Sequence, residues 1–235
     1  LTPPVNHWWH VPLYVSARGL TTSPMPVGGR SIEVAFDFIA HRLEITCTDG
    51  AYDYIALEPM SVATFHRQVM AALDRLGVRP DIWTTPCEIE NPIPFEQDEV
   101  HKSYDPEAAQ RFWRVLVQAD RVMKAFRGRF IGKASPVHFF WGSFDLAVTR
   151  FSGRRAPPRA GPAFERDAYS HEVISHGFWT GSGPVLEPAF YAYAAPEPDG
   201  LKDARVQPQA AYYHRQLGEF ILPYDAVRQA DAPDE

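Results

Sequence analysis

Much of this chain consists of short runs in which apolar and polar residues alternate, separated by proline, glycine or Asp-Gly turns. Residues 32–38 and 43–47 show this alternation, and Asp49-Gly50 follows them as a turn signal. A period of two indicates half-buried β-strands. Only residues 62–76 and 106–127 repeat apolar side chains at helical spacing. We therefore expect an α+β protein with mostly antiparallel sheets and a few packed helices.

The expected elements follow from these periods and from capping signals. Ser61 is a suitable N-cap for the first helix and Gly77 a suitable end, whereas Asp105-Pro106 begins the longer one. Strands are expected at 11–15, 32–38, 43–47, 54–57, 82–85, 137–150, 171–179, 189–195, 210–214 and 219–223.

Composition excludes several classes of partner. The 235 residues carry a net charge of −6, which argues against a general nucleic-acid binder. No apolar run reaches the roughly 18 residues that span a bilayer, and no signal peptide is visible. The two cysteines, Cys47 and Cys87, have no metal-type spacing, which is typical of a reducing compartment. We expect a cytoplasmic protein that does not bind membranes, and a homodimer is compatible with the sequence.

Two segments of the chain resemble each other. Residues 4–15 align with 136–146, so that His7 falls on His138 and an aromatic pair follows each histidine. This similarity predicts an internal duplication, with pseudo-repeat halves 1–100 and 105–235 in a single compact domain over 1–235. Chance similarity between aromatic-rich segments is the alternative. The duplication also predicts further helices beyond both ends of the chain.

No familiar catalytic motif is present, since the phosphate-binding loops, the G-x-S-x-G elbow, H-E-x-x-H and C-x-x-C are all missing from the sequence. Histidine placement stands out instead. His7, His138, Glu172 and His176 are the candidate metal ligands, because imidazole and carboxylate together suit a divalent transition metal, and two histidines with one carboxylate suit non-haem iron. The alternative is that these histidines bond to backbone carbonyls beside the core.

Three residues are candidates for catalysis: Asp145, Glu172 and His171. Asp145 lies in an aromatic and aliphatic run, where a carboxylate must be paired, be protonated or face solvent. A paired or protonated Asp145 could act as a general base. The solvent-facing side of an alternating strand is the simpler alternative.

Arginines and tryptophans provide candidate ligand contacts. Arg150 and Arg154 lie at a strand end and in the basic loop 152–159, where they could clamp an anion, although a solvated loop explains them equally well. Trp9 and Trp141 could line an organic ligand's cavity or belong to the core.

The longest motifs resemble a known family. The chain is similar to a bacterial family catalogued only as a domain of unknown function, number 5996, in residues 6–15 (NHWWHVPLYV), 19–24 (GLTTSP), 135–151 (SPVHFFWGSFDLAVTRF) and 169–175 (YSHEVIS). The resemblance covers essentially the whole chain. It implies membership of the family but no activity, substrate or catalytic residue.

Two functional hypotheses follow. The first is an enzyme acting on a small molecule in a His, carboxylate and aromatic pocket between the two halves, with a divalent metal as its candidate cofactor and hydrolysis or redox chemistry as its reaction. The alternative is a non-catalytic small-molecule-binding protein that uses an aromatic cavity and the arginine loop. A purely structural module is the third class, and it predicts no deep pocket.

Overall fold

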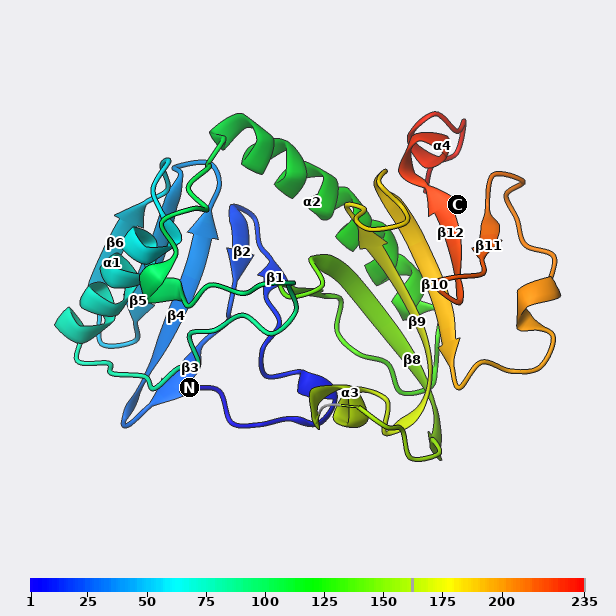
Figure 1. The fold of residues 1–235 in the computed structure, drawn as a ribbon, viewed down its shortest axis with the longest axis horizontal. Helices are drawn as coiled ribbons and strands as arrows, with labels where there is room; N and C mark the ends of the chain where they lie inside the picture. Colours follow the sequence, from blue (N-terminus) through cyan, green and yellow to red (C-terminus); the bar gives the residue numbers. More distant parts are fainter. Residues whose placement is uncertain (162, 235) are drawn as a thin grey trace. The chain divides into compact units, whose positions relative to one another are not determined.

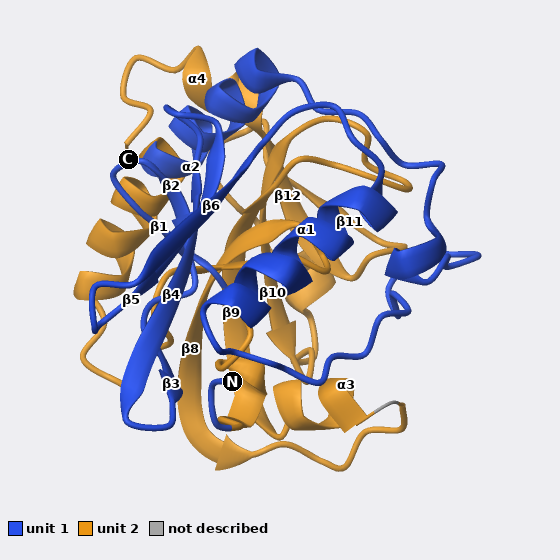
Figure 2. Cartoon of the chain, turned by 90° about the vertical axis from the view of Figure 1, so that its left-hand side faces the viewer, with its two compact units in different colours: residues 1–3, 13–117 blue, residues 4–12, 118–235 orange. Residues whose placement is uncertain are grey.

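The protein is described here by a computed structural model, which covers residues 1–161 and 163–234. The expected α+β class is confirmed, with two six-stranded antiparallel sheets. The chain divides into two compact units, one of residues 1–3 and 13–117 and the other of residues 4–12 and 118–235 (Figure 2). The boundary between these units falls inside the long helix, between Val117 and Gln118. Residues 4–12 belong to the second unit.

The first unit contains a sheet in which β3 pairs only with β4 and the other strands follow the order β1-β2-β4-β5-β6 (Figure 1). Its strands are β1 (Tyr14–Val15), β2 (Gly19–Thr21), β3 (Met25–Val27), β4 (Arg30–Asp37), β5 (Arg42–Cys47) and β6 (Tyr52–Ala56). Alternation along β5 is clear, because Leu43, Ile45 and Cys47 are buried while their neighbours keep exposed surface.

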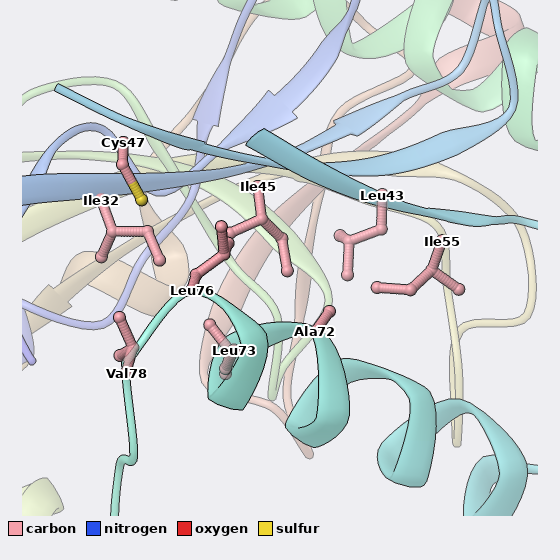
Figure 3. Close-up of a cluster of buried hydrophobic side chains, with 9 residues drawn as sticks. All are labelled: Ile32, Leu43, Ile45, Cys47, Ile55, Ala72, Leu73, Leu76 and Val78. Carbon is pink, nitrogen blue, oxygen red and sulfur yellow. The ribbon is translucent and has the colours of Figure 1, made fainter. Parts of the chain in front are cut away.

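Helix α1 (Val62–Arg75) covers one face of this sheet. The Ser61 hydroxyl accepts a hydrogen bond from the Thr64 backbone N–H at 3.1 Å, and Gly77 follows the helix with φ of 71°, as expected of a capped helix. The packed core of the unit is shown in Figure 3 and consists of Ile32, Leu43, Ile45, Cys47, Ile55, Ala72, Leu73, Leu76 and Val78.

The second unit contains a sheet in the order β11-β12-β10-β9-β8-β7. Its strands are β7 (His138–Phe140), β8 (Asp145–Arg155), β9 (His171–Trp179), β10 (Ala189–Ala195), β11 (Tyr212–His214) and β12 (Glu219–Pro223). The remaining helices of the described chain are α2 (Pro106–Gly128), α3 (Ala163–Ala168) and α4 (Tyr224–Arg228), with 3-10 turns η1 (Asn6–Trp8), η2 (Phe95–Gln97) and η3 (Leu201–Asp203).

The expectation of a strand at 82–85 is wrong. Residues 82–85 form no strand, and the side chains of Ile82 and Trp83 are 43% and 81% exposed, so no apolar face is available to hold them in a sheet. The aligned segments around His7 and His138 also differ. His138 begins strand β7, whereas His7 lies in the 3-10 turn η1. Further along the alignment, Val15 in β1 corresponds to Leu146 in β8, and the duplication stays a prediction.

The helices of the described chain include none with the length and apolar character required to cross a bilayer.

Candidate functional site

One face of the second sheet carries a row of polar side chains. Asp145 on β8 pairs with Trp179 on β9, so Asp145, Ala147 and Thr149 share a face with Gly177 and Ser175. On the next strand, Tyr191 and Tyr193 pair with Gly177 and Ser175 and point to the same side. We call this surface the tyrosine face and define it by its polar residues: Ser143, Asp145, Thr149, Ser175, Tyr191, Tyr193 and Glu219.

Asp145 and Tyr191 are joined by a hydrogen bond across the intervening strand. The Tyr191 hydroxyl donates to Asp145 Oδ2, and the Ser143 hydroxyl donates to Asp145 Oδ1 at 2.7 Å. Gly177 lies between them on β9, and a Cβ atom at this position would be 2.2 Å from Cζ of Tyr191. The absence of a side chain at Gly177 is therefore what allows the Tyr191 ring to lie over the sheet and reach Asp145.

A second set of hydroxyl groups continues along the same face. The Tyr191 and Tyr193 rings are stacked, with centroids 6.0 Å apart and planes 17° apart. The Tyr193 hydroxyl lies 3.0 Å from that of Tyr169, and Ser175 Oγ lies 3.0 Å from Thr149 Oγ1. These contacts give the face several adjacent hydrogen-bond donors and acceptors beside flat aromatic rings.

Both carboxyl groups on this face have a raised pKa. Burial raises the pKa of Asp145, which outweighs the opposite effect of the hydrogen bonds from Tyr191 and Ser143. Burial, followed by the nearby charge of Asp145, raises the pKa of Glu219 to about 7. Burial and then Asp145 also raise the pKa of Tyr191. Among the described residues, no cationic side chain contributes to the pKa of Asp145 or Glu219.

Asp145 follows directly from a strained turn. Phe144 has a φ of 58°, a conformation that a bulky side chain rarely adopts, and backbone strain of this kind is concentrated at functional sites. Phe144 is 48% exposed and Trp141, in the same turn, is 57% exposed. The indole N–H of Trp141 donates to the Val11 carbonyl at 3.0 Å. The turn between β7 and β8 therefore presents two aromatic side chains next to the buried carboxyl group.

The N-terminal histidine lies at a second strained turn. His7 and Trp8 have φ of 62° and 59°, although neither is glycine. His7 Nδ1 lies 2.9 Å from the Ala168 carbonyl, and its ring lies 4.8 Å from that of Phe151 and 5.5 Å from that of His171. The carbonyl can only accept, so Nδ1 carries the proton.

The expected metal ligands do not lie together. Glu172 and His176 point to the opposite face of β9 from Ser175 and Gly177, and the His176 ring packs at 4.6 Å against Phe126 of α2. His138 pairs with Ala147 and so lies on the tyrosine side, where its ring is 6.1 Å from that of Trp9. Within residues 1–161 and 163–234 there is no group of three His, Cys, Asp or Glu side chains that could hold a metal ion.

The two other candidate catalytic residues occupy different environments from Asp145. Glu172 accepts hydrogen bonds from Arg154 Nε and the Ser152 hydroxyl, both at 2.8 Å, and its pKa is lowered by these contacts. His171 lies beside Ser170, with Nδ1 3.2 Å from the hydroxyl oxygen. Asp145 itself is buried, so the expectation that it faces solvent is wrong.

The candidate arginines are engaged within the protein. Arg150 places its guanidinium 3.6 Å from the centroid of the Phe126 ring and donates from Nη2 to the Phe126 carbonyl at 2.8 Å. It therefore closes the C-terminal end of α2, where a cation is favourable. Arg154 forms an ion pair with Glu172 at 2.6 Å. The contacts of Arg150 with Phe126 and of Arg154 with Glu172 use part of each guanidinium group, which would otherwise be available to bind an anion.

Of the residues that define the tyrosine face, only Asp145 was a predicted site residue. The aromatic side chains of residues 190–193 were interpreted as the lining of a ligand cavity or as core, and Glu219 had no assigned role. The signal was present in β10, where tyrosine alternates with alanine over residues 191–194 and so places both hydroxyl groups on one side. Which carboxyl group they meet depends on strand register, which alternation alone does not give.

These features define an α+β protein of two antiparallel sheets with a buried Asp–Tyr pair on one of them. The family model of DUF5996, described as a family of unknown function, matches residues 1–235, and the chain belongs to this family. The expected resemblance is thereby confirmed. Neither the curated proteins nor the solved structures contain a match.

Proposed function

We propose that the protein is an enzyme that performs acid–base chemistry on a small molecule at the tyrosine face. The hydrogen bond between the Tyr191 hydroxyl and the buried Asp145 carboxyl group is the observation that carries this proposal. Burial raises the pKa of the Asp145 carboxyl group and so makes its carboxylate a stronger base than an ordinary aspartate, as a general base requires.

Asp145, Tyr191 and Glu219 have separate roles in the proposed chemistry. Asp145, oriented by Tyr191 and Ser143, takes a proton from the substrate. Glu219, with a pKa of about 7, is populated in both protonation states near neutrality and returns a proton. Because no cation of the described chain pairs with Asp145 or Glu219, the face suits a neutral or cationic substrate better than a phosphate or carboxylate.

Solvent access supports a role in chemistry over a purely structural one. Tyr191, Tyr193 and Glu219 each retain partial exposure, while Asp145 is buried and hydrogen-bonded to Tyr191. The roles assigned here require none of the four side chains expected to bind a metal. We also place the protein in the cytoplasm, since both cysteines are free and Cys87 is exposed.

Incubation of the purified protein with a metabolite extract, followed by mass spectrometry, tests the proposal. The wild type should convert at least one metabolite, whereas Asp145→Asn and Tyr191→Phe should lower the rate by about 100-fold or more, the usual contribution of a positioned acid or base. His214→Gln, on the neighbouring strand β11, is the matched control. Conversion that persists in both site variants would overturn the assignment of these residues.

Non-catalytic binding is the second candidate function. The observation that favours it is the exposure of Trp141 and Phe144 in the turn before Asp145, because exposed aromatic side chains bind organic ligands without chemistry. In the same extract, a binding protein would be thermally stabilised without consuming any metabolite, and Trp141→Ala would abolish the stabilisation.

A further inference from the structure

Two tyrosines form an exposed aromatic pair on the first unit, and neither belongs to the proposed active site. Tyr52 and Tyr54 are 48% exposed each, and their rings lie 6.1 Å apart with planes 30° apart. Both lie on β6, which pairs only with β5 and so is an edge strand of its sheet. Helix α1 packs on the opposite face, where Asp53 forms an ion pair with Arg75 of that helix at 2.8 Å.

Polar groups surround the aromatic pair on the same face of the sheet. Tyr54 pairs with Glu44 and Tyr52 with Thr46, so these side chains project to one side. The Tyr52 hydroxyl lies 3.4 Å from Glu44 Oε1, and the Arg42 guanidinium lies 4.5 Å from the centroid of the Tyr54 ring. The surface therefore combines two flat apolar rings with a carboxylate, a guanidinium and hydroxyl groups.

We propose that this surface, defined by Arg42, Glu44, Thr46, Tyr52 and Tyr54, binds a neutral oligosaccharide. The C–H faces of a sugar ring stack on aromatic rings, and carboxylate and guanidinium groups make paired hydrogen bonds with neighbouring hydroxyls. The two rings are side by side along the strand, which suits successive sugar residues of one glycan chain.

The balance of charge favours a neutral ligand over nucleic acid. Arg42 is accompanied by Glu44 on β5 and by Glu33 on β4, which pairs with Thr46. Single-stranded nucleic acids also stack on aromatic rings, but they require a positively charged groove. Here carboxylates outnumber cations, and the whole chain carries a charge of −6.

Affinity gel electrophoresis tests the proposal with the full chain. Native gels containing soluble neutral polysaccharides, namely xylan, β-glucan, dextran or galactomannan, should retard the wild type in at least one case. Tyr52→Ala/Tyr54→Ala should bind that polysaccharide about tenfold more weakly or worse, a loss of roughly 1.4 kcal/mol. Tyr52→Phe/Tyr54→Phe should retain most of the binding, because stacking requires only the rings.

The matched control is Tyr212→Ala, which removes a tyrosine of similar exposure (44%) from β11, the edge strand of the other sheet. It should leave the retardation unchanged. The proposal is overturned if no polysaccharide retards the wild type, or if the Tyr52→Ala/Tyr54→Ala variant is retarded as strongly as the wild type. It is also overturned if the wild type binds oligo-dT in preference to every glycan. A wild type that sediments as a dimer, with the Tyr52→Ala/Tyr54→Ala variant as a monomer, would overturn it as well.

Discussion

The ring of Tyr191 occupies the space that a side chain at Gly177 would fill. A Cβ atom built on Gly177 lies 2.3 Å from the Tyr191 hydroxyl oxygen, and the two residues are direct cross-strand partners on β9 and β10. This relationship lets one tyrosine cross the neighbouring strand and donate a hydrogen bond to Asp145 on the strand beyond it.

Gly177→Ala should therefore displace Tyr191 from Asp145. We expect a loss of about 1–3 kcal/mol in the free energy of unfolding, as for overpacking of a filled site, because the added methyl group meets a ring with little room to move. Urea denaturation measures this loss. Gly29→Ala is the control, since nothing lies within 4 Å of a Cβ at that position. Equal stability of the two variants would contradict the packing described for Tyr191.

Glu219→Gln should change how stability varies with pH. The folded-state pKa of about 7 lies above the ordinary 4.5, so the folded chain holds a proton that the unfolded chain releases. This stabilisation is complete below pH 4.5 and is lost as pH rises through about 7. Relative to Glu219→Gln, the wild type should lose roughly 1–2 kcal/mol over this range, less than the full shift implies because Glu219 is partly exposed.

Denaturation of wild type and Glu219→Gln at a series of pH values measures this difference. A difference in unfolding free energy that stays constant between pH 4.5 and pH 7 would show that Glu219 titrates normally.

His176→Leu should protect the protein against mild acid. Burial, followed by the charge of Arg150, lowers the pKa of His176 from 6.5 to about 4. The stability contributed by the neutral ring is complete above pH 6.5 and is lost as pH falls through about 4. The wild type should therefore lose roughly 1–2 kcal/mol more than the variant over this interval. Above pH 7 the difference in unfolding free energy between the wild type and His176→Leu should be independent of pH, which serves as the internal control.

Arg150→Lys should destabilise the protein although the charge is retained. A lysine cannot reproduce the stacked guanidinium over Phe126 together with the hydrogen bond to its carbonyl. We expect a loss of about 1–2 kcal/mol in thermal or chemical unfolding. Arg154→Lys, which alters an exposed ion pair with Glu172, should cost less than about 0.5 kcal/mol. A larger loss of stability in Arg154→Lys than in Arg150→Lys would contradict the role assigned to Arg150.

Elements whose signals are local were predictable from the sequence. Helix α1 begins after Ser61 and ends before Gly77 because capping and a left-handed residue act within a few positions. The strands at 32–38, 43–47 and 189–195 follow from alternation, and each is present within a residue or two. Residues 82–85 have strand-like composition, but their exposed side chains lack a partner surface.

The candidate site was only partly predictable, because it depends on which strands become neighbours. Asp145 attracted attention as a carboxylate in an apolar run, and the structure gives it two hydroxyl partners. Tyr191 and Gly177 are fourteen positions apart in sequence, and only the pairing of β9 with β10 brings them together. The expected metal ligands are divided for the same reason, since Glu172 and His176 project from one face of the sheet and His138 from the other.

The division of the chain into two units has a consequence for folding during synthesis. The unit that carries Asp145 and Tyr191 is built from residues 4–12 and 118–235, which are separated by residues 13–117 of the other unit. Residues 4–12 leave the ribosome more than a hundred residues before the strands they pack against, whereas the first sheet can form as soon as it emerges. Assembly of the candidate site therefore requires the last strands, because Glu219 lies on β12.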